Sequence, residues 1–237
     1  MVFAAILAGG SGKRMKRELP KQYLDIGDKP IIIHTLIKFL KAPGIDKIYI
    51  GVNENWIDYC GKLIKKYLDV PSKPIILVKG GKERYDTLFN LIDKVEEENG
   101  KNKEHIFVSH EAVRPFVTVD MIEKSIIAAK ECGACNTVVG AKDTIILSKD
   151  GVNTDSMPSR DEIYLGQCPQ SFNLSMLKEL ILNLSEEEKK TLTDACKIFI
   201  LNNKPVKLIE GDASNFKITT KGDYDIAKAM ADEYLEE

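Results

Sequence analysis

The sequence is poor in the residue types that build many catalytic sites. Its 237 residues include only three histidines, His34, His105 and His110, and a single tryptophan. No specific Ser-His-Asp arrangement can be assembled from so few histidines. His110 and Glu111 are followed by Arg114 where a zinc-binding HExxH helix would have its second histidine. Nucleophilic triads and zinc sites of that kind are therefore disfavoured.

Long apolar runs and a strong net charge are also absent. No stretch approaches the length of a membrane span, and residues 1–7 lack the basic start and long apolar region of a signal peptide. The formal net charge is only −2, which argues against a basic track for nucleic acid. We expect a cytoplasmic protein that binds neither membranes nor nucleic acid.

Cysteine is scarce and irregularly spaced. The five cysteines are an odd number with scattered spacing, which agrees with a reducing compartment. Cys132 and Cys135 form the only close pair, and neither a second pair nor a nearby histidine accompanies them. A metal or redox role for this pair is therefore the less favoured interpretation.

What the sequence does contain is a regular alternation of apolar and amphipathic stretches. With 43% hydrophobic residues, the chain can bury a substantial core in one large domain. Strands are predicted at 2–6, 48–52, 74–78, 105–109 and 136–140, and helices at 30–41, 56–68, 84–98 and 120–131. Such alternation predicts a Rossmann-like α/β fold, a mostly parallel twisted sheet with helices on both faces.

The alternation breaks near residue 143. Residues 143–147, an Asp150-Gly151 turn, a polar stretch and residues 163–165 predict a protruding β-ribbon arm. Because an isolated ribbon is marginal in water, we expect it to pack on another subunit.

The helix and strand pattern resumes after this arm. Helices are predicted near 174–183 and from Ser185 toward Leu201, then a strand at 206–210 and a final helix capped by Thr220 and Asp223. There is no repeat or clean linker, so the prediction is a single domain, 1–237, with a dimerisation arm at about 141–166.

A glycine-rich basic loop follows the first predicted strand. Residues 9–12 include three glycines, which let the backbone turn tightly and expose successive N–H groups. The nearby cations, which suit a polyphosphate, are Lys13, Arg14, Lys16, Arg17 and Lys21. Leu7 and Arg14 break the Walker pattern, and Met15 breaks the dinucleotide fingerprint. A solvated basic turn is the alternative interpretation.

Two further motifs follow predicted strands. Residues 80–84 (GGKER) come after the third strand, and residues 110–115 (HEAVRP) come after the fourth. Ligands of parallel sheets bind beyond the carboxyl ends of the strands. The sequence therefore predicts a binding site at this edge of the sheet.

In their order along the chain, the motifs resemble cytidylyltransferases of the methylerythritol-phosphate/ribitol-phosphate type. They are residues 7–22, 80–84, 110–115, 143–144, 166–170, 193–195 and 215–220, and they span nearly the whole chain. The closer likeness is to ribitol-5-phosphate cytidylyltransferases, at residues 6–10, 112–116, 167–172 and 193–197. The resemblance implies a fold of the nucleotidyltransferase type and a homodimer.

The reaction implied by the resemblance is attack of a sugar-alcohol phosphate on the α-phosphorus of CTP, with loss of pyrophosphate. The preferred acceptor is D-ribitol 5-phosphate, giving CDP-ribitol for teichoic acid or related cell-surface polymers. The alternative acceptor is 2-C-methyl-D-erythritol 4-phosphate of isoprenoid synthesis, and an inactive nucleotide-binding sensor is a remote alternative. A phosphate monoester is mostly dianionic at neutral pH, so this nucleophile needs no general base.

The resemblance also assigns site residues. Catalytic roles against the phosphates fall to Arg14, Lys21 and Lys217. The CTP contacts that it implies are Leu7, Ala8, Gly9, Gly10, Ser11, Gly12, Gly80, Gly81, Arg84, Thr87, Glu111 and Ala112. Those for the alditol phosphate are Thr144, Arg160, Cys168 and Thr193. From the residues alone, Lys217 would be a solvated strand lysine, and Arg84 and Thr87 would serve a surface ion pair and a helix cap.

Two of these residues depart from the family pattern. Glu111 stands where an aspartate that approaches Mg²⁺ is usual, and its extra methylene bears on a ligand role because Mg²⁺ demands near-ideal octahedral geometry. Mg²⁺ is still the expected cofactor. Cys168 replaces a usual threonine, and a packing role is favoured over a catalytic thiol because no activating base is evident. In relatives the arm reaches the neighbouring subunit's site, so Arg160 is expected to act there.

Overall fold

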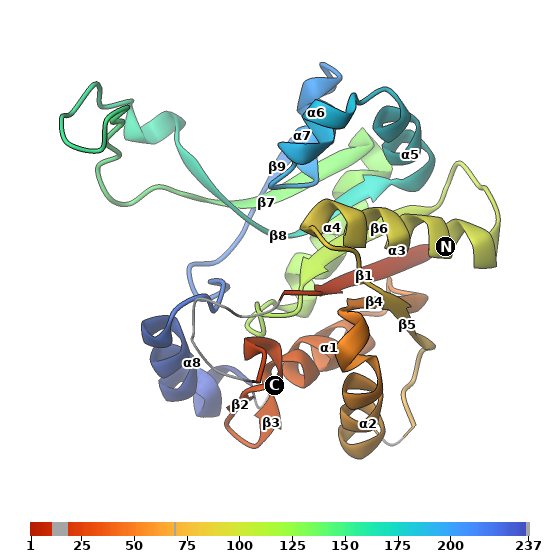
Figure 1. Ribbon diagram of the computed structural model, residues 1–237. Helices are drawn as coiled ribbons and strands as arrows, with labels where there is room; N and C mark the ends of the chain where they lie inside the picture. Colours follow the sequence, from red (N-terminus) through yellow and green to blue (C-terminus); the bar gives the residue numbers. More distant parts are fainter. Residues whose placement is uncertain (11–18, 69, 236–237) are drawn as a thin grey trace.

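A seven-stranded mixed sheet organises the protein (Figure 1). The computed structural model describes residues 1–10, 19–68 and 70–235, and the strand order is β5-β4-β1-β6-β8-β7-β9. The parallel half consists of β1 (Val2–Ala8), β4 (Lys47–Val52), β5 (Ile75–Lys79) and β6 (Ile106–Glu111). The other half consists of β8 (Tyr164–Asn173), antiparallel to β6 and β7, with β7 (Ala134–Gly140) and β9 (Lys207–Glu210) parallel to each other. The predicted α/β fold class is confirmed.

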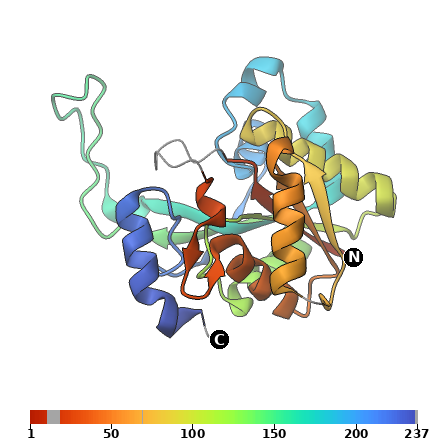
Figure 2. The ribbon, with the colours of Figure 1, turned by 60° about the horizontal axis from the view of Figure 1, so that its bottom comes forward.

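Helices cover both faces of the sheet (Figures 1 and 2). One face packs against α1 (Ile31–Lys41), α2 (Ile57–Tyr67) and α4 (Val119–Cys132). The other face packs against α3 (Arg84–Asn99), α5 (Leu174–Leu182) and α7 (Cys196–Leu201). Because both faces are buried, the central strands are nearly continuous apolar runs.

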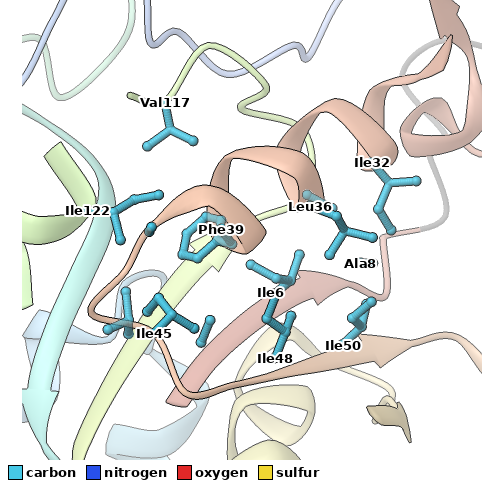
Figure 3. Packing of buried hydrophobic residues seen from close by; sticks show 14 of the residues in the cluster. Ile6, Ala8, Ile32, Leu36, Phe39, Ile45, Ile48, Ile50, Val117 and Ile122 are labelled. Atoms are coloured by element: carbon cyan, nitrogen blue, oxygen red, sulfur yellow. The ribbon is translucent and has the colours of Figure 1, made fainter. Parts of the chain in front are cut away.

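The side chains of β1 alternate between the two cores. Ile6 faces the core of α1, where Figure 3 shows it beside Leu36 and Phe39, and Phe3 faces the core on the opposite side. Ile6 and Phe3 are both fully buried. Truncation of one such isoleucine to alanine typically costs about 2–5 kcal/mol of stability. This packing fixes the position of β1 between the two layers of helices.

The C-terminal helix packs against a hairpin formed by residues 25–30. The short strands β2 (Asp25–Ile26) and β3 (Lys29–Pro30) form a hairpin beside α8 (Lys221–Tyr234), as both ribbon views show. The hydroxyl of Tyr224 donates a hydrogen bond to the Asp25 carbonyl at 2.7 Å. The predicted cap is confirmed, since Thr220 and Asp223 form a capping box at the start of α8. This contact brings the segment before α8 next to the region that follows β1.

The arm differs from the predicted ribbon. Residues 141–163 project from the sheet as an irregular segment (Figures 1 and 2), with one isolated bridge between Leu147 and Ser156 and a single turn, η4 (Arg160–Glu162). Residues 164–165, expected in the ribbon, begin the central strand β8. Strand β8 was not predicted because its polar residues and Pro169 break the usual strand pattern.

The helix predicted from Ser185 toward Leu201 is divided into α6 (Glu186–Lys190) and α7. Ser185 caps α6 with Glu188 as predicted from its position. The Asp194 carboxylate then accepts a hydrogen bond from the Cys196 backbone N–H at 2.7 Å, and such local bonds compete with a continuous helix. None of the helices in the described ranges combines the length and apolarity needed to cross a bilayer.

Candidate active site

A cavity of about 550 Å³ lies at the carboxyl ends of β1, β4, β5 and β6. We call it the first cavity. The turn η2 (Lys21–Tyr23) and residues 217–219 close its other side. The structure thus brings together motifs that are far apart in the sequence. The predicted residues that line it are Leu7, Ala8, Gly9, Gly10, Lys21, Gly81, Arg84, Thr87, Glu111, Ala112 and Lys217. Ser11, Gly12 and Arg14 lie outside the described residues.

The turn after β5 is built around Thr87. Its hydroxyl accepts a hydrogen bond from the Gly81 N–H at 3.0 Å and donates one to the Glu83 carbonyl at 3.3 Å. A Cβ on Gly81 would lie 2.0 Å from the Cβ of Asp86, so this turn requires glycine. A Cβ on Gly80 would also approach the Thr87 hydroxyl closely. Thr87 therefore supports the cavity wall, and its predicted contact with cytosine stays a prediction.

Two neighbouring residues of η2 join it to other parts of the cavity wall, Gln22 to residues 8–10 and Lys21 to the segment before α8. The Gln22 amide, 2% exposed, donates hydrogen bonds to the carbonyls of Ala8 at 2.8 Å and Gly10 at 3.0 Å. The Lys21 ammonium donates to the Ile218 carbonyl at 2.8 Å. Sequence reasoning did not assign a role to Gln22, although the residue directly follows the predicted catalytic Lys21. The sequence did offer one signal: an amide side chain, which can bond to backbone carbonyls, follows shortly after the glycine-rich loop.

Glu111 is the centre of a charged cluster on the first cavity. Its side chain is 9% exposed, and its Oε1 atom lies 2.6 Å from Lys217 Nζ and 3.3 Å from Arg84 Nη2. Its Oε2 atom lies 3.0 Å from Arg114 Nε. Burial alone would raise the pKa of Glu111, but Lys217, Arg84 and Arg114 outweigh it and lower the pKa to about 2. Glu111 is therefore a carboxylate at any ordinary pH.

Arg114 connects this cluster to the segment that carries Lys217. Its Nη1 group donates a hydrogen bond to the Asn215 carbonyl at 2.8 Å, and the Asn215 amide donates to the Cys168 carbonyl at 2.7 Å. These bonds hold residues 215–217 against β8. Arg114 belongs to the motif after β6, but nothing in that motif singled it out as a residue of the site.

A second cavity, of about 1020 Å³, lies where β7, β8 and β9 meet the base of the arm. Its walls include Gln167 and Asp212, as well as Lys142 and Asp143 from the arm. Within the described part of the chain, Lys217 alone lines both cavities. Lys217 therefore stands at the junction of two spaces of substrate size, with its ammonium group bound to Glu111 of the first cavity.

The four residues predicted to bind the alditol phosphate do not converge within one chain. Thr144 and Arg160 are exposed on the arm, where Arg160 donates a hydrogen bond to the Lys142 carbonyl at 3.0 Å, and neither lines the first or the second cavity. Thr193 is exposed, and its carbonyl accepts from Arg84 Nη1 at 3.0 Å. Cys168 is buried, and burial raises the pKa of its thiol to about 12. This burial agrees with the packing role favoured for Cys168.

The described residues offer no ready site for a metal ion. No group of three or more histidine, cysteine, aspartate or glutamate side chains among them could hold one. Glu111 pairs with cations at both oxygens, and Glu83, the other carboxylate of the described wall, caps α3. The residues present therefore do not fit a protein-bound Mg²⁺, and the ligand role expected of Glu111 is not supported by its surroundings.

The histidines do not belong to the site. His110 is fully buried beside Phe39, its Nε2 atom lies 3.1 Å from the Arg114 carbonyl, and burial lowers its pKa to about 4. The first cavity thus presents cations, backbone groups and two carboxylates, Glu83 in a helix cap and Glu111 in ion pairs, with no histidine on its described wall. This set of groups suits binding and neutralisation of phosphates rather than proton transfer.

The family model described as 2-C-methyl-D-erythritol 4-phosphate cytidylyltransferase (IspD) matches residues 2–233. The chain belongs to this family. Among similar solved structures, the 4-diphosphocytidyl-2C-methyl-D-erythritol synthase of Anaerococcus prevotii DSM 20548 is 25% identical, with a TM-score of 0.81 over 98% of this chain and 96% of that one.

Two further IspD-type structures support the fold. The cytidylyltransferase of Francisella tularensis is 24% identical, with a TM-score of 0.78 over 96% of this chain and 98% of its own. That of Thermus thermophilus is 23% identical, with a TM-score of 0.73 over 98% of this chain and 100% of its own.

Membership of the IspD family confirms the predicted enzyme class. The chain is a cytidylyltransferase, and enzymes of this family use CTP and a phosphorylated sugar substrate. The preference for ribitol 5-phosphate expected from the sequence is not confirmed. The similar structures are named for methylerythritol phosphate, which fits the alternative better.

Proposed function

We propose that this enzyme transfers CMP from CTP to 2-C-methyl-D-erythritol 4-phosphate. The observation that carries the two-substrate arrangement is the position of Lys217 at the junction of the two cavities. CTP would occupy the first cavity, at the strand ends where parallel sheets bind their ligands. The acceptor would occupy the second. The choice of acceptor is supported by the family match and by the names of the similar structures.

The proposed chemistry needs neutralisation and alignment rather than a base. An oxygen of the acceptor phosphate attacks the α-phosphorus of CTP, the bond from this phosphorus to the β-phosphate oxygen breaks, and pyrophosphate leaves with that electron pair. Lys217 would meet both anions at the junction, and Lys21 would contribute a second cation. Gln22 would hold the loop backbone in place. Preorganised cations of this kind stabilise charge that develops in the transition state.

We propose that Mg²⁺ arrives as part of the substrate, as the Mg·CTP complex. The carboxylates on the described wall are already engaged, whereas Mg²⁺ commonly binds substrate phosphates and retains several waters. Chelation with EDTA should abolish turnover, and added Mg²⁺ should restore it. Full activity after stringent chelation would contradict this proposal.

We propose that the single domain, 1–237, dimerises through its arm. Several apolar side chains of the arm are exposed, including Val152 at 85% and Met157 at 62%. A segment with so little cover of its own is expected to pack on another surface. In a homodimer, Arg160 would reach the second cavity of the neighbouring subunit and bind the acceptor phosphate there, with Thr144 and Thr193 nearby.

Ribitol 5-phosphate is the second candidate acceptor. It is favoured by the loop sequence at residues 6–10 and by residues 193–197, which resemble ribitol-5-phosphate cytidylyltransferases. Enzymes of the isoprenoid branch usually carry Pro-Ala-Ala-Gly in that loop and a further acidic residue after Thr-Asp. The product of transfer to ribitol 5-phosphate, CDP-ribitol, would serve the synthesis of teichoic acid or related cell-surface polymers.

One experiment separates these possibilities. Purified protein is incubated with CTP, Mg²⁺ and either acceptor phosphate, and the release of pyrophosphate is followed. Efficient turnover with methylerythritol phosphate and poor turnover with ribitol phosphate supports the proposal. The reverse preference would establish the second candidate. Tight CTP binding with neither acceptor consumed would point to the inactive nucleotide sensor.

A further inference from the structure

The Glu111 carboxylate has more cationic partners than a metal ligand could keep. Lys217 and Arg84 share its Oε1 atom, and Arg114 occupies its Oε2 atom. Three of the roughly four lone-pair positions of this carboxylate are therefore taken, and a metal ion at the remaining position would face three cations at close range. In a buried site such like-charge contacts are poorly screened.

We infer that Glu111 is a positioning residue, an internal counter-ion that fixes Lys217 at the junction of the two cavities. This inference rests on the proposed function for the role of Lys217. It assigns to Glu111 a function through other side chains rather than through a metal ion.

Glu111 positions Lys217 in two ways. It binds the ammonium directly at 2.6 Å. It also holds Arg114, whose Nη1 group binds the carbonyl of Asn215, two residues before Lys217. The tip of the lysine and the backbone near its root are therefore both tied to one carboxylate.

The same carboxylate keeps three cations close together. Lys217, Arg84 and Arg114 all lie within 3.3 Å of its oxygens. Removal of a buried charge leaves its partners uncompensated, so they would separate from one another. A neutral residue at position 111 should therefore release Lys217 from the junction even if the fold survives.

The length of the side chain offers a second argument. Glu111 extends one methylene beyond the aspartate that is usual at this position. An aspartate here would retract its oxygens from partners that now lie at hydrogen-bond distance. The counter-ion role thus predicts that Glu111→Asp impairs the enzyme, whereas a ligand role predicts that it does not, because aspartate is itself a common Mg²⁺ ligand.

A double-mutant cycle tests the inference on nucleotide binding. Affinity for a CTP analogue with a methylene bridge between the α- and β-phosphorus is measured by calorimetry for wild type, Glu111→Gln, Lys217→Met and the double variant, each with Mg²⁺. We expect each single variant to lose about tenfold in affinity, and the double variant to lose no more than twofold beyond Lys217→Met. Glu54→Gln, which removes an exposed partner of Lys79 outside the cavities, is the matched control.

The Mg²⁺ dependence provides the second measurement. The Mg²⁺ concentration for half-maximal analogue binding should stay within twofold of wild type in Glu111→Gln. A tenfold increase, together with additive losses in the cycle, would overturn the inference in favour of a metal ligand. If Glu111→Gln fails to fold, Glu111→Asp takes its place in the cycle. Wild-type affinity in that variant would also overturn the inference.

These measurements do not involve the acceptor. Failure of both acceptor phosphates in the turnover experiment would refute the proposed function and leave the binding cycle to decide the role of Glu111. If the losses of analogue affinity are additive while the enzyme turns over its acceptor normally, the positioning role of Glu111 is refuted and the proposed function stands.

Discussion

The two cavities differ in how completely one chain builds them. The first is bordered by buried side chains, including Gln22, Thr87 and Glu111, each of which bonds to another group of the cavity wall. The second is bordered by half-exposed side chains such as Tyr164 and Leu165 and by the irregular arm. The first therefore has its binding groups preorganised, whereas the second leaves room for the neighbouring subunit that we propose.

The difference follows from the connections of the sheet. Around the first cavity, parallel strands end at one edge, and the connections after β4, β5 and β6 are short and lead into helices that pack on the sheet. Beside the second cavity, residues 141–163 form a long connection with little regular structure. Connections of this length without regular structure are uncommon in compact domains, and binding loops are one of their usual roles. Lys217 links the two regions, and substitutions in each region should affect different substrates.

The largest expected effect is that of Lys217→Met. Because Lys217 lines both cavities, the loss of its ammonium should lower kcat about a hundredfold, corresponding to about 3 kcal/mol of transition-state stabilisation. Steady-state kinetics with both substrates provide the measurement. Lys207→Met, which removes an exposed lysine paired with Glu131, is the control and should keep wild-type turnover. Turnover of Lys217→Met within twofold of wild type would exclude a shared role.

Acid should destabilise the region beneath the first cavity. Burial lowers the pKa of His110 to about 4 from its usual 6.5. As the pH falls, the unfolded chain therefore binds a proton at this histidine before the folded chain does. The contribution of His110 to the free energy of unfolding is complete above about pH 6.5 and is lost as the pH falls toward 4. This loss amounts to about 3 kcal/mol in all. Glu111, with a pKa of about 2 against 4.5, loses its own contribution only between about pH 4.5 and 2.

Urea unfolding at several pH values measures this loss. The free energy of unfolding should already fall between pH 6.5 and 5, before carboxylates titrate. The pKa values of His34 and His105 are also lowered by burial, so their contributions have the same sign. A constant free energy of unfolding over this interval would contradict the prediction.

Arg160→Ala tests the second cavity. If this exposed arginine binds the acceptor phosphate of the neighbouring site, its removal should raise KM for the acceptor about tenfold and leave KM for CTP nearly unchanged, because one charge-assisted hydrogen bond contributes about 1.5–3 kcal/mol. Kinetics with each substrate varied in turn provide the measurement. Lys149→Ala, another exposed cation on the arm, is the control.

Co-expression then shows in which subunit Arg160 acts. A hybrid of Arg160→Ala and Lys217→Met chains has one site with both residues intact, so part of the activity should return. If hybrids confirmed by mass turn over no faster than the two parent dimers at an acceptor concentration below KM, while CTP binding is intact, Arg160 acts within its own chain or only in folding.

The parallel half of the fold could be predicted from sequence because each buried strand is a short apolar run followed by a turn signal. Strand β8 could not, because its place between β6 and β7 depends on pairing with distant residues rather than on its own polar sequence. In the site, Lys217 lies 106 residues from Glu111 along the chain. Only the ordered family motifs singled it out, since an isolated lysine carries no spacing signal. The partners of Glu111 emerged from the geometry alone.

The smallest expected effect belongs to Gln22→Leu, which tests whether the first cavity depends on its internal bonds. The substitution keeps the volume but removes two hydrogen bonds to the loop carbonyls of Ala8 and Gly10. Because a buried acceptor left without a partner costs about 1–3 kcal/mol, the loop should shift, and KM for CTP should rise about tenfold. The acceptor's KM should not change, since Gln22 does not line the second cavity. Asn90→Leu, which removes an exposed amide bonded to the Lys79 carbonyl, is the control. Equal rises in both KM values would mean that the two cavities are not independent, and the contrast drawn between them would fail.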